Sequence, residues 1–406
     1  MKFAYDIVIA GGGMVGSLLG CALGDSGLKV AVLEHRPPEP PPAQGYDLRV
    51  SAITLASVAI FKAIGAWGAM KHRVAPVREM KVWDATGTGS IHFDAAEIGE
   101  PCLAYIIENS VMQSAFIERL HHFTNVHYLC PVEIAALDLT LEAATVTLQD
   151  GRTLRAKLLV GADGAQSRAR ELAGIAVRRF PFEQKGIVAN VVTGKPHAEI
   201  ARQRFLPAGP LAFLPLPEPH LCSIVWSAES KRADELMALD DAAFLGELQQ
   251  ASGDLLGQIQ SIGPRAVFPL ALAHAVSYVS ERLALVGDAA HTVHPLAGQG
   301  VNLGYLDAAT LAEVLLDAAG QKKDIGALPV LRRFERWRKG ENMAMLAVTG
   351  GFKQLFSNNL PGVRELRNVG LNLTNAAAPI KNLIMRRASG LEGDLPRLAR
   401  RTGSVP

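Results

Sequence analysis

The sequence predicts an α/β fold, and three stretches carry that prediction. Residues 5–33 read as strand, Gly-rich turn, helix and strand, and residues 282–307 read as strand, acidic turn, Gly-rich loop and helix. Between about residue 180 and residue 263 the pattern is strand-rich and broken by Pro and Gly, which favours an antiparallel sheet. We therefore expect a Rossmann-like domain, an inserted antiparallel-sheet domain and a C-terminal helical segment.

Length and composition are those of a folded protein with a large interior. The chain has 406 residues, of which 49% are hydrophobic and 20% charged, and a formal net charge of +2. These values exclude extensive disorder and give no support for a nucleic-acid-binding surface. The four cysteines are scattered without a C-x-x-C pair, so no zinc site or disulfide framework is expected. We expect neither a transmembrane helix nor a secretory signal, because long apolar runs are missing and the first strand begins almost at once.

The N-terminal stretch predicts a dinucleotide-binding βαβ unit. A buried-strand pattern at 5–10 is followed by Gly11-Gly12-Gly13-Met14-Val15-Gly16, which matches G-x-G-x-x-G. Gly11 allows the tight turn, Gly13 lets the backbone approach a pyrophosphate, and Gly16 lets the helix pack closely on the sheet. A second strand at 29–33 ends in Glu34, which can accept hydrogen bonds from the hydroxyls of an adenosine ribose. The motif alone does not separate NAD from FAD.

The stretch from 282 to 307 has the composition of an anion-binding loop. A short apolar run at 283–286 is typical of a buried strand, and Gly287-Asp288 breaks it where open α/β sheets hold their ligands. Gly298, Gly300 and a helix expected to begin near Val301 would direct free backbone N–H groups and the positive end of the helix dipole into the same crevice. An ordinary connection rarely needs Gly and His at this density, so we expect a ligand here.

A second acidic turn, at Asp163, completes a recognisable set of three turns. Residues 158–168, LLVGADGAQSR, are again a strand end followed by an acidic turn. GADG from Gly161 resembles the Asp-Gly motif of the FAD-dependent aromatic hydroxylases, the class A flavoprotein monooxygenases, and GDAAH with HPLAGQGVNLG from Gly287 resembles their second motif. With the N-terminal G-x-G-x-x-G these form an ordered triple, and the resemblance spans about the first 350 residues. Shorter runs resemble the ubiquinone-biosynthesis hydroxylases within that group: Asp47-Leu48-Arg49, Gln203-Arg204-Phe205-Leu206-Pro207 and Ser223 to Ser227 around Trp226.

This resemblance implies an enzyme and its cofactor. The sequence shows no Ser-His-Asp signature, metal-ligand cluster or P-loop, so a cofactor must supply the reactive atom, and the resemblance identifies it as FAD. The implied reaction hydroxylates the aromatic ring of a polyprenylated phenol or quinol with dioxygen, through a flavin C4a-hydroperoxide. NAD(P)H or another reductant would visit transiently, because no second nucleotide fold is visible. Two alternatives stay open: a flavin oxidoreductase without oxygenation, such as a prenyl reductase or a halogenase, and a non-catalytic FAD-bound assembly subunit.

The expected site residues follow from the motifs and from the resemblance. The family places Arg49 near the flavin or its diphosphate and a flavin-contacting side chain at about Asn109, where a helix cap is an equally good interpretation. N–H groups from Gly300 to Asn302 would stabilise negative charge on reduced flavin. The cofactor-binding set is Gly11, Gly13, Gly16, Glu34, Arg49, Asn109, Asp163, Asp288, Gly298, Gly300 and Asn302. The candidate catalytic residues are His291 and His294, as proton acceptors or relays without a definite step, and Pro295, which suits exclusion of water; each imidazole is equally well structural.

The expected division of the chain is discontinuous. Segments 1–77, 100–180 and 264–350 form the FAD-binding domain, 78–99 and 181–263 form the substrate domain, and 351–406 is a C-terminal helical segment. On the substrate sheet, Phe205, Phe213 and Trp226 are candidates for lining the substrate site, although core packing explains each of them better.

The C-terminal segment predicts contact with a membrane surface. Between Lys353 and Arg387 there are six basic residues and one acid, Glu365, and apolar residues recur at helical spacing among them. An interfacial helix pairs apolar insertion with anionic headgroups in this way, and a solvated helix docked on the flavin domain is the alternative. We expect a cytoplasmic protein, peripheral at the inner face of the membrane, with association with other ubiquinone-biosynthesis proteins as a further implication of the resemblance.

Overall fold

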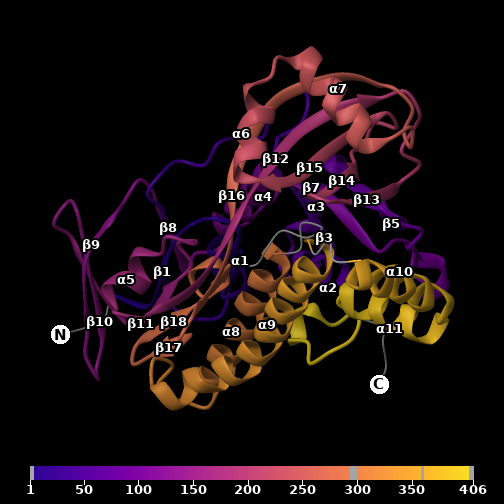
Figure 1. The fold of residues 1–406 in the computed structure, drawn as a ribbon. Coiled ribbons are helices and arrows are strands. Elements are labelled where there is room, and N and C mark those ends of the chain that lie inside the picture. Colours follow the sequence, from indigo (N-terminus) through magenta and orange to yellow (C-terminus); the bar gives the residue numbers. More distant parts are fainter. Residues whose placement is uncertain (1–3, 293–299, 358–360, 402–406) are drawn as a thin grey trace.

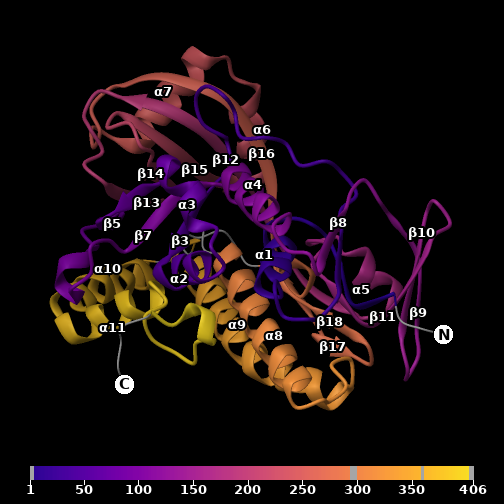
Figure 2. The ribbon, with the colours of Figure 1, turned by 180° about the vertical axis from the view of Figure 1, so that it is seen from behind.

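The computed structural model describes residues 4–292, 300–357 and 361–401 of the chain. Figure 1 shows one sheet with α6 and α7 at the top, a second sheet at the lower left, long helices α8 and α9 at the lower centre, and α10 and α11 at the lower right. The view from behind shows the same arrangement, with the C-terminal helices far from the β9 and β10 hairpin (Figure 2).

The first sheet, built on β1, has parallel strands at its centre. β1 pairs in parallel with β2 and β11, and β11 pairs in parallel with β18. Ile7, Val8 and Ile9 are consecutive and fully buried, so both faces of the sheet are covered. The order is β17-β18-β11-β1-β2-β8, with β10 beside β11 and β9 beside β10. The bounds are β1 Tyr5–Ala10, β2 Val30–Leu33, β8 Val126–Leu129, β9 Ile134–Leu139, β10 Ala144–Leu148, β11 Thr153–Gly161, β17 Val279–Ser280 and β18 Leu283–Leu285.

Helices and one small sheet surround this first sheet. α1 packs against α4 and α8, and α8 packs against α9. The small antiparallel sheet has the order β3-β7-β4. The helix bounds are α1 Met14–Ala22, α2 Leu55–Ala63, α3 Trp67–Met70, α4 Asn109–Leu120, α5 Arg168–Leu172, α8 Gly300–Gly320 and α9 Leu328–Ser357, with 3-10 turns η1 Lys71–Arg73 and η3 Gly287–Ala289. The strand bounds are β3 Val50–Thr54, β4 Ala75–Val77 and β7 Ala104–Glu108.

The second sheet is the predicted antiparallel one. Its order is β19-β16-β12-β15-β14-β13-β5-β6, and all its pairs are antiparallel except β13 with β5. Two strands from the segment 78–99, which was expected to belong to the substrate domain, form its edge. α6 and α7 cover one face and bury a separate apolar cluster there. The bounds are β5 Glu79–Asp84, β6 Ser90–Asp94, β12 Val177–Thr193, β13 Ile200–Leu206, β14 Gly209–Pro215, β15 Leu221–Glu229, β16 Ile259–Ala275, β19 His291–Thr292, α6 Ser230–Ala238 and α7 Asp241–Ser252.

The C-terminal helices dock on the open edge of the second sheet. Asn368, Asn372 and Asn375 lie one above another on α10, and their side-chain oxygens accept hydrogen bonds of 2.7 to 3.1 Å from backbone N–H groups of residues 89, 90 and 92. Unpaired N–H groups at a sheet edge are thereby satisfied. The bounds are α10 Pro361–Ala376 and α11 Ala378–Ala388, with 3-10 turns η2 Ala95–Ile98 and η5 Arg397–Ala399. None of the described helices is long and apolar enough to cross a membrane.

Three of the expected domain boundaries fall inside single elements, and the first of them, at 180/181, lies within β12. The boundary at 263/264 lies within β16, and the boundary at 350/351 lies within α9. A sequence pattern changes gradually along a long strand or helix, so it does not mark such a boundary. The division into domains stays a prediction.

Candidate functional site

Three turns far apart in the sequence meet at one edge of the first sheet. In the strand register Ala10 lies opposite Gly161, and Gly161 lies opposite Leu285. The carboxyl ends of β1, β11 and β18 therefore lie side by side, and the G-x-G-x-x-G turn, the Asp163 turn and the Asp288 turn follow directly. Open α/β sheets bind their ligands at this edge.

The glycines of the first turn have two different environments. A Cβ added to Gly16 would lie 1.9 Å from the carbonyl oxygen of Gly11, so only Gly allows α1 to approach the turn this closely. A Cβ added to Gly13 would meet nothing within 4 Å. Gly13 has an extended backbone with φ of −69°, which any residue adopts. The open space at Gly13 therefore leaves room for a ligand beside the backbone, and the tight contact at Gly16 does not.

A cleft of about 660 Å³ opens from these turns toward the second sheet. Ligand sites for small molecules and cofactors have volumes of about 300–1,000 Å³. Its walls come from both large sheets, the β3 region and the first turn of α8. The predicted residues that line it are Gly11, Gly13, Glu34, Arg49, Asn109, Asp163, Asp288 and Gly300. Gly16, His291 and Asn302 are not among its lining residues, and His294, Pro295 and Gly298 lie outside the described residues.

Glu34 is held in place at one part of the cleft wall. One carboxylate oxygen accepts a hydrogen bond of 2.8 Å from the N–H of Gly12, and the other accepts bonds of 2.9 and 3.1 Å from the N–H groups of His35 and Arg36. The acid at the end of β2 is thus fixed against the Gly-rich turn.

The two acidic turns differ in what their carboxylates bind. Asp163 accepts hydrogen bonds from Ser167 Oγ at 2.5 Å and from the N–H of Ala169 at 2.9 Å, so its carboxylate organises the start of α5. Within the described residues, no donor contacts the carboxylate of Asp288, which is accessible from the cleft although protein surrounds it elsewhere. Desolvation by the protein around it raises the pKa of Asp288, against the opposing charges of His291 and Arg49. Asp288 is therefore the carboxylate with free acceptor capacity toward a ligand.

Asn109 lines the cleft and does not cap its helix. Glu108 occupies the N-cap position of α4, and no side chain caps the helix there. The side-chain oxygen of Asn109 accepts a hydrogen bond of 2.8 Å from Ser51 Oγ. The capping interpretation of Asn109 is therefore wrong, because Glu108 occupies the cap position. The carboxylate of Glu108 accepts hydrogen bonds from Arg73 Nε and from the N–H of Asp47, both at 2.7 Å. These contacts fix the backbone that carries Arg49.

Asn302 holds the first turn of α8 through hydrogen bonds on the side away from the cleft. Its side-chain oxygen accepts hydrogen bonds from the N–H of Thr54 at 3.0 Å and from Ser57 Oγ at 2.7 Å, and its Nδ2 donates to the carbonyl of Ala52 at 2.8 Å. The side chain is 4% exposed. It ties the first turn of α8 to β3 and α2, while Gly300, Val301 and Gly304 provide the surface that faces the cleft.

His291 lies in a buried polar network. Its Nε2 is 2.5 Å from Asp307 Oδ2, which also accepts the N–H of Gly287 at 3.1 Å. Asp307 Oδ1 accepts Arg338 Nε at 2.9 Å and Asn342 Nδ2 at 3.0 Å. Burial alone would raise the pKa of Asp307, but the charges of His291 and Arg338 and these hydrogen bonds hold it well below its usual value.

This network changes the interpretation of His291. The imidazole is 1% exposed and does not line the cleft, so it has no direct path to a ligand bound there. The structure supports a positioning role for it, at the start of β19 behind the Asp288 turn. Its place in the loop left proton transfer and a structural role equally open, and a sequence does not show that Asp307, sixteen residues later, accepts its ring N–H.

The second sheet contributes residues that the sequence analysis missed. Phe205, Phe213 and Trp226 are buried in apolar clusters away from the cleft, so the core interpretation is correct. The cleft is lined instead by residues of β12, β15 and β16, namely Val188, Ser223, Val225, Phe268, Pro269, Leu270 and Ala271. The alternation of apolar residues in these strands could have assigned them to one face, but not the face that meets the first sheet.

Comparisons with known proteins agree with this geometry. Residues 4–324 match the family model of the FAD binding domain. The chain is 40% identical to the ubiquinone hydroxylase UbiL of Rhodospirillum rubrum, with 97% of this chain and 92% of that protein covered. It is 39% identical to 3-demethoxyubiquinol 3-hydroxylase of Escherichia coli (95% and 98% covered) and 36% identical to the mitochondrial ubiquinone biosynthesis monooxygenase COQ6 of Danio rerio (95% and 90% covered).

Solved structures show the same fold. The p-nitrophenol 4-monooxygenase PnpA of Pseudomonas putida superimposes with a TM-score of 0.78 at 20% identity, covering 97% of this chain and 99% of that one. PqsL of Pseudomonas aeruginosa, a probable FAD-dependent monooxygenase, superimposes with a TM-score of 0.75 at 25% identity, covering 91% and 100%. At this identity the likeness to PnpA concerns the fold alone.

Proposed function

The chain belongs to the FAD-dependent ubiquinone-biosynthesis hydroxylases, and from this membership we propose that it hydroxylates the aromatic ring of a polyprenylated phenol or quinol. It is an FAD-dependent monooxygenase. The observation that carries the proposed substrate class is the cleft itself, which runs from the dinucleotide turns to an apolar face of the second sheet.

The residues of the cleft fit FAD. The open space at Gly13, the helix packing at Gly16 and the fixed carboxylate of Glu34 suit a pyrophosphate followed by an adenosine ribose. Asp288 has acceptor capacity that no described residue uses. Bound FAD supplies acceptance of a hydride and activation of dioxygen. We assign the adenosine end to Glu34 and the flavin end to Asp288, Arg49, Asn109 and the first turn of α8.

The protein contributes orientation, electrostatics and exclusion of water. The backbone N–H groups at the start of α8 and the helix dipole stabilise negative charge in front of Gly300. Asn302 holds that helix end in place, and the network of His291 and Asp307 holds the turn that carries Asp288. The apolar side chains of β12, β15 and β16 keep water from the far side of the cleft. A phenol ring placed between the start of α8 and these apolar side chains would lie on Val188, Val225 and Leu270.

An experiment with reductants separates the proposal from its alternatives. The purified flavoprotein is mixed with NADH or NADPH without oxygen, with and without a polyprenylated phenol, and bleaching of the flavin is followed before air is admitted. A hydroxylase yields a hydroxylated ring only after oxygen enters. Saturation of the prenyl chain without oxygen would identify a reductase, and no product under any condition would identify an assembly subunit. Rapid bleaching by one nucleotide identifies NAD(P)H as the reductant.

We also propose that the protein works at the cytoplasmic face of a membrane, bound through α10 and α11. Val369, Leu373, Ile380 and Leu383 on these helices are 53%, 65%, 57% and 47% exposed. Such apolar exposure next to basic residues suits an interfacial site. An apolar chain leaves the bilayer at a cost of about 0.8 kcal/mol per CH₂, so a prenylated substrate favours an enzyme at the lipid surface. Association with other enzymes of the same biosynthesis fits this location.

Two cations of this segment have partners within the protein. Lys381 was expected to contact headgroups, but its Nζ lies 2.7 Å from Glu97 and its side chain is 9% exposed. Arg386 donates to the carbonyl of Ile98 at 3.3 Å. Both residues fasten α11 to the η2 turn, a contact that spans almost 300 residues of sequence and has no local signal. Changing them to Gln would disturb docking of the helix as well as its charge.

Flotation with vesicles of phosphatidylcholine and phosphatidylserine tests the membrane site. The double variant Leu373→Gln/Leu383→Gln should float less than the parent protein, and less still at high salt. Leu141→Gln is the matched control, since Leu141 is 76% exposed on the hairpin of β9 and β10, at the other end of the molecule. Equal flotation of the double variant and the parent would remove the membrane proposal.

A further inference from the structure

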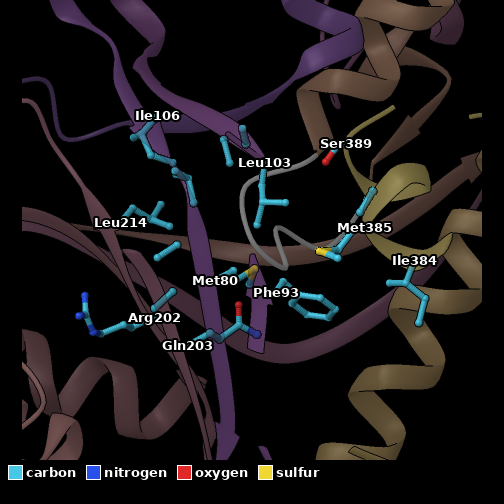
Figure 3. A pocket seen from close by; sticks show the side chains of 16 residues that line it. Met80, Phe93, Leu103, Ile106, Arg202, Gln203, Leu214, Ile384, Met385 and Ser389 are labelled. Atoms are coloured by element: carbon cyan, nitrogen blue, oxygen red, sulfur yellow. The ribbon is translucent and has the colours of Figure 1, made fainter. Parts of the chain in front are cut away.

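A second, apolar cavity lies between the second sheet and α11. It has a volume of about 120 Å³ and an almost wholly apolar lining. Figure 3 shows Met80 and Phe93 of the sheet and Met385 of α11 turned toward one another across it, with Leu214 and Leu103 at its other sides. A cavity of about 150 Å³ lined by apolar side chains stays dry and binds benzene, so this one holds a group of about five carbons.

The one charged residue among those that line this cavity is already engaged by backbone carbonyls. Arg202 also lines it, but its Nη1 donates to the carbonyls of His197 and Ile200 at 2.9 and 3.0 Å. Desolvation lowers the pKa of Arg202, as expected for a guanidinium held against the protein interior. The chemistry of the lining selects an apolar occupant.

Strand register connects this cavity to the cofactor cleft. Residues directly opposite each other in paired strands point to the same face of a sheet. Ala212 and Leu214 of β14 line the apolar cavity, and their partners on β15, Val225 and Ser223, line the cleft. The two sites therefore share one face of one sheet, on neighbouring strands, and Val225 packs against the same apolar cluster as Leu214.

The outer end of the cavity reaches the exposed surface of α11. Ile384 lines the cavity and is 41% exposed. Its neighbours on α11, Ile380 and Leu383, are 57% and 47% exposed and belong to the proposed membrane surface. An apolar path thus leads from the cleft, along the sheet face, to the helix that we propose lies on the lipid.

We infer that this cavity is the subsite for an unbranched or isoprenoid hydrocarbon chain attached to the aromatic substrate. The inference rests on the proposed function, and it assigns the part of the substrate distant from the ring. The chain leaves the cleft across Val225 and Leu214, passes under α11 between Phe93 and Met385, and emerges beside Ile384. Affinity for a prenylated phenol over an unprenylated one then comes from burial of chain carbons at this place.

A matched pair of substitutions on α11 tests the subsite. Ala388 lines the cavity and is exposed, so Ala388→Phe fills the mouth without burying a new side chain in the core. Ala378→Phe makes the same change at the exposed start of the same helix, away from the cavity. kcat/KM is measured for a prenylated phenol and for the same phenol without its chain, and retained FAD verifies folding.

The expected result is selective. Ala388→Phe should lower kcat/KM about tenfold or more for the prenylated phenol, through KM, because several chain carbons lose their contacts. It should leave the unprenylated phenol unchanged, and Ala378→Phe should leave both unchanged. Equal effects of Ala388→Phe on both phenols, or no effect on either, would overturn the subsite while leaving hydroxylation intact.

A labelling experiment tests the same site without catalysis. An alkyl phenol with a diazirine at the fifth chain carbon is irradiated with the FAD-bound protein, and the labelled peptides are identified. Labels on the segments that contain Phe93 and Met385, reduced in Ala388→Phe, support the subsite. Labels elsewhere contradict it. If the protein binds the probe at this place but hydroxylates neither phenol, the proposed function fails and the subsite stands.

Discussion

Replacement of Gly13 by Val should remove FAD without unfolding the protein. An added Cβ at Gly13 meets no protein atom within 4 Å, and the backbone there is already extended, so the Cβ of Val is accommodated without strain. The new methyl groups instead occupy the space beside the backbone where a pyrophosphate would lie. The perturbation thus separates binding of the cofactor from formation of the turn.

The size of the effect follows from the contacts that are lost. A hydrogen bond to a charged group contributes about 1.5–3 kcal/mol. Loss of one bond between the turn and the diphosphate should therefore raise the Kd of FAD roughly ten- to hundredfold, and displacement of the whole diphosphate should raise it further. The free energy of unfolding of the apo-protein should change by less than about 1 kcal/mol, since nothing is displaced.

Flavin absorbance and urea unfolding of the apo-protein provide the two measurements. Gly16→Ala is the opposite control, because its Cβ would lie 1.9 Å from the carbonyl oxygen of Gly11 and must distort the turn. It should lower the unfolding midpoint as well as the flavin content. A Gly13→Val protein that is purified with stoichiometric FAD would refute the assignment of this turn.

Three further predictions concern buried or cleft-facing carboxylates. Asp288→Ala should weaken FAD binding roughly ten- to hundredfold, more than Asp163→Ala does, because Asp163 already accepts hydrogen bonds from Ser167 and Ala169. Titration of both apo-variants with FAD measures the two dissociation constants, and equal losses of affinity would be inconsistent with this prediction. Arg338→Ala leaves Asp307 buried without its guanidinium partner and should cost about 3–5 kcal/mol in urea unfolding; Arg338→Lys, which keeps the charge, should cost less. The pKa of Asp307 is lowered in the fold, so its stabilising contribution is complete above its unfolded pKa of 3.8 and is lost as pH falls below that value. In unfolding experiments from pH 6 downward, Asp307→Asn should therefore lose stability less steeply than the parent protein. Parallel curves would show that Asp307 does not titrate in this way.

The sequence predicted the parts of the site that depend on local pattern. The three turns at Gly11, Asp163 and Asp288 each follow a buried strand, and parallel strands bring their carboxyl ends to one edge. Gly spacing predicted the close approach of α1, and the structure confirms it, because a Cβ added at Gly16 would lie only 1.9 Å from the carbonyl oxygen of Gly11. The antiparallel sheet was also predicted, because its strands are separated by Pro and Gly.

The side-chain partners that the sequence did not predict are contacts between residues distant in sequence. Asn109 was interpreted as a possible cap because it begins a helix, but Ser51 holds its side chain. His291 was left open between proton transfer and a structural role because it lies in the loop, and Asp307 and the buried guanidinium of Arg338 lie behind it. Lys381 was counted as a surface cation, and Glu97 neutralises it. In each case, periodicity gives the element correctly but not the partner of the side chain.

We propose that this cleft uses FAD and dioxygen to hydroxylate a prenylated aromatic ring. The most direct measurement is incubation of the reduced flavoprotein with a polyprenylated phenol under ¹⁸O-labelled dioxygen, followed by mass spectrometry of the product. We predict one ¹⁸O atom on the ring, and loss of that product in Gly13→Val. Reoxidation of the flavin with hydrogen peroxide as the only labelled product, for every prenylated phenol and quinol tested, would contradict the claim.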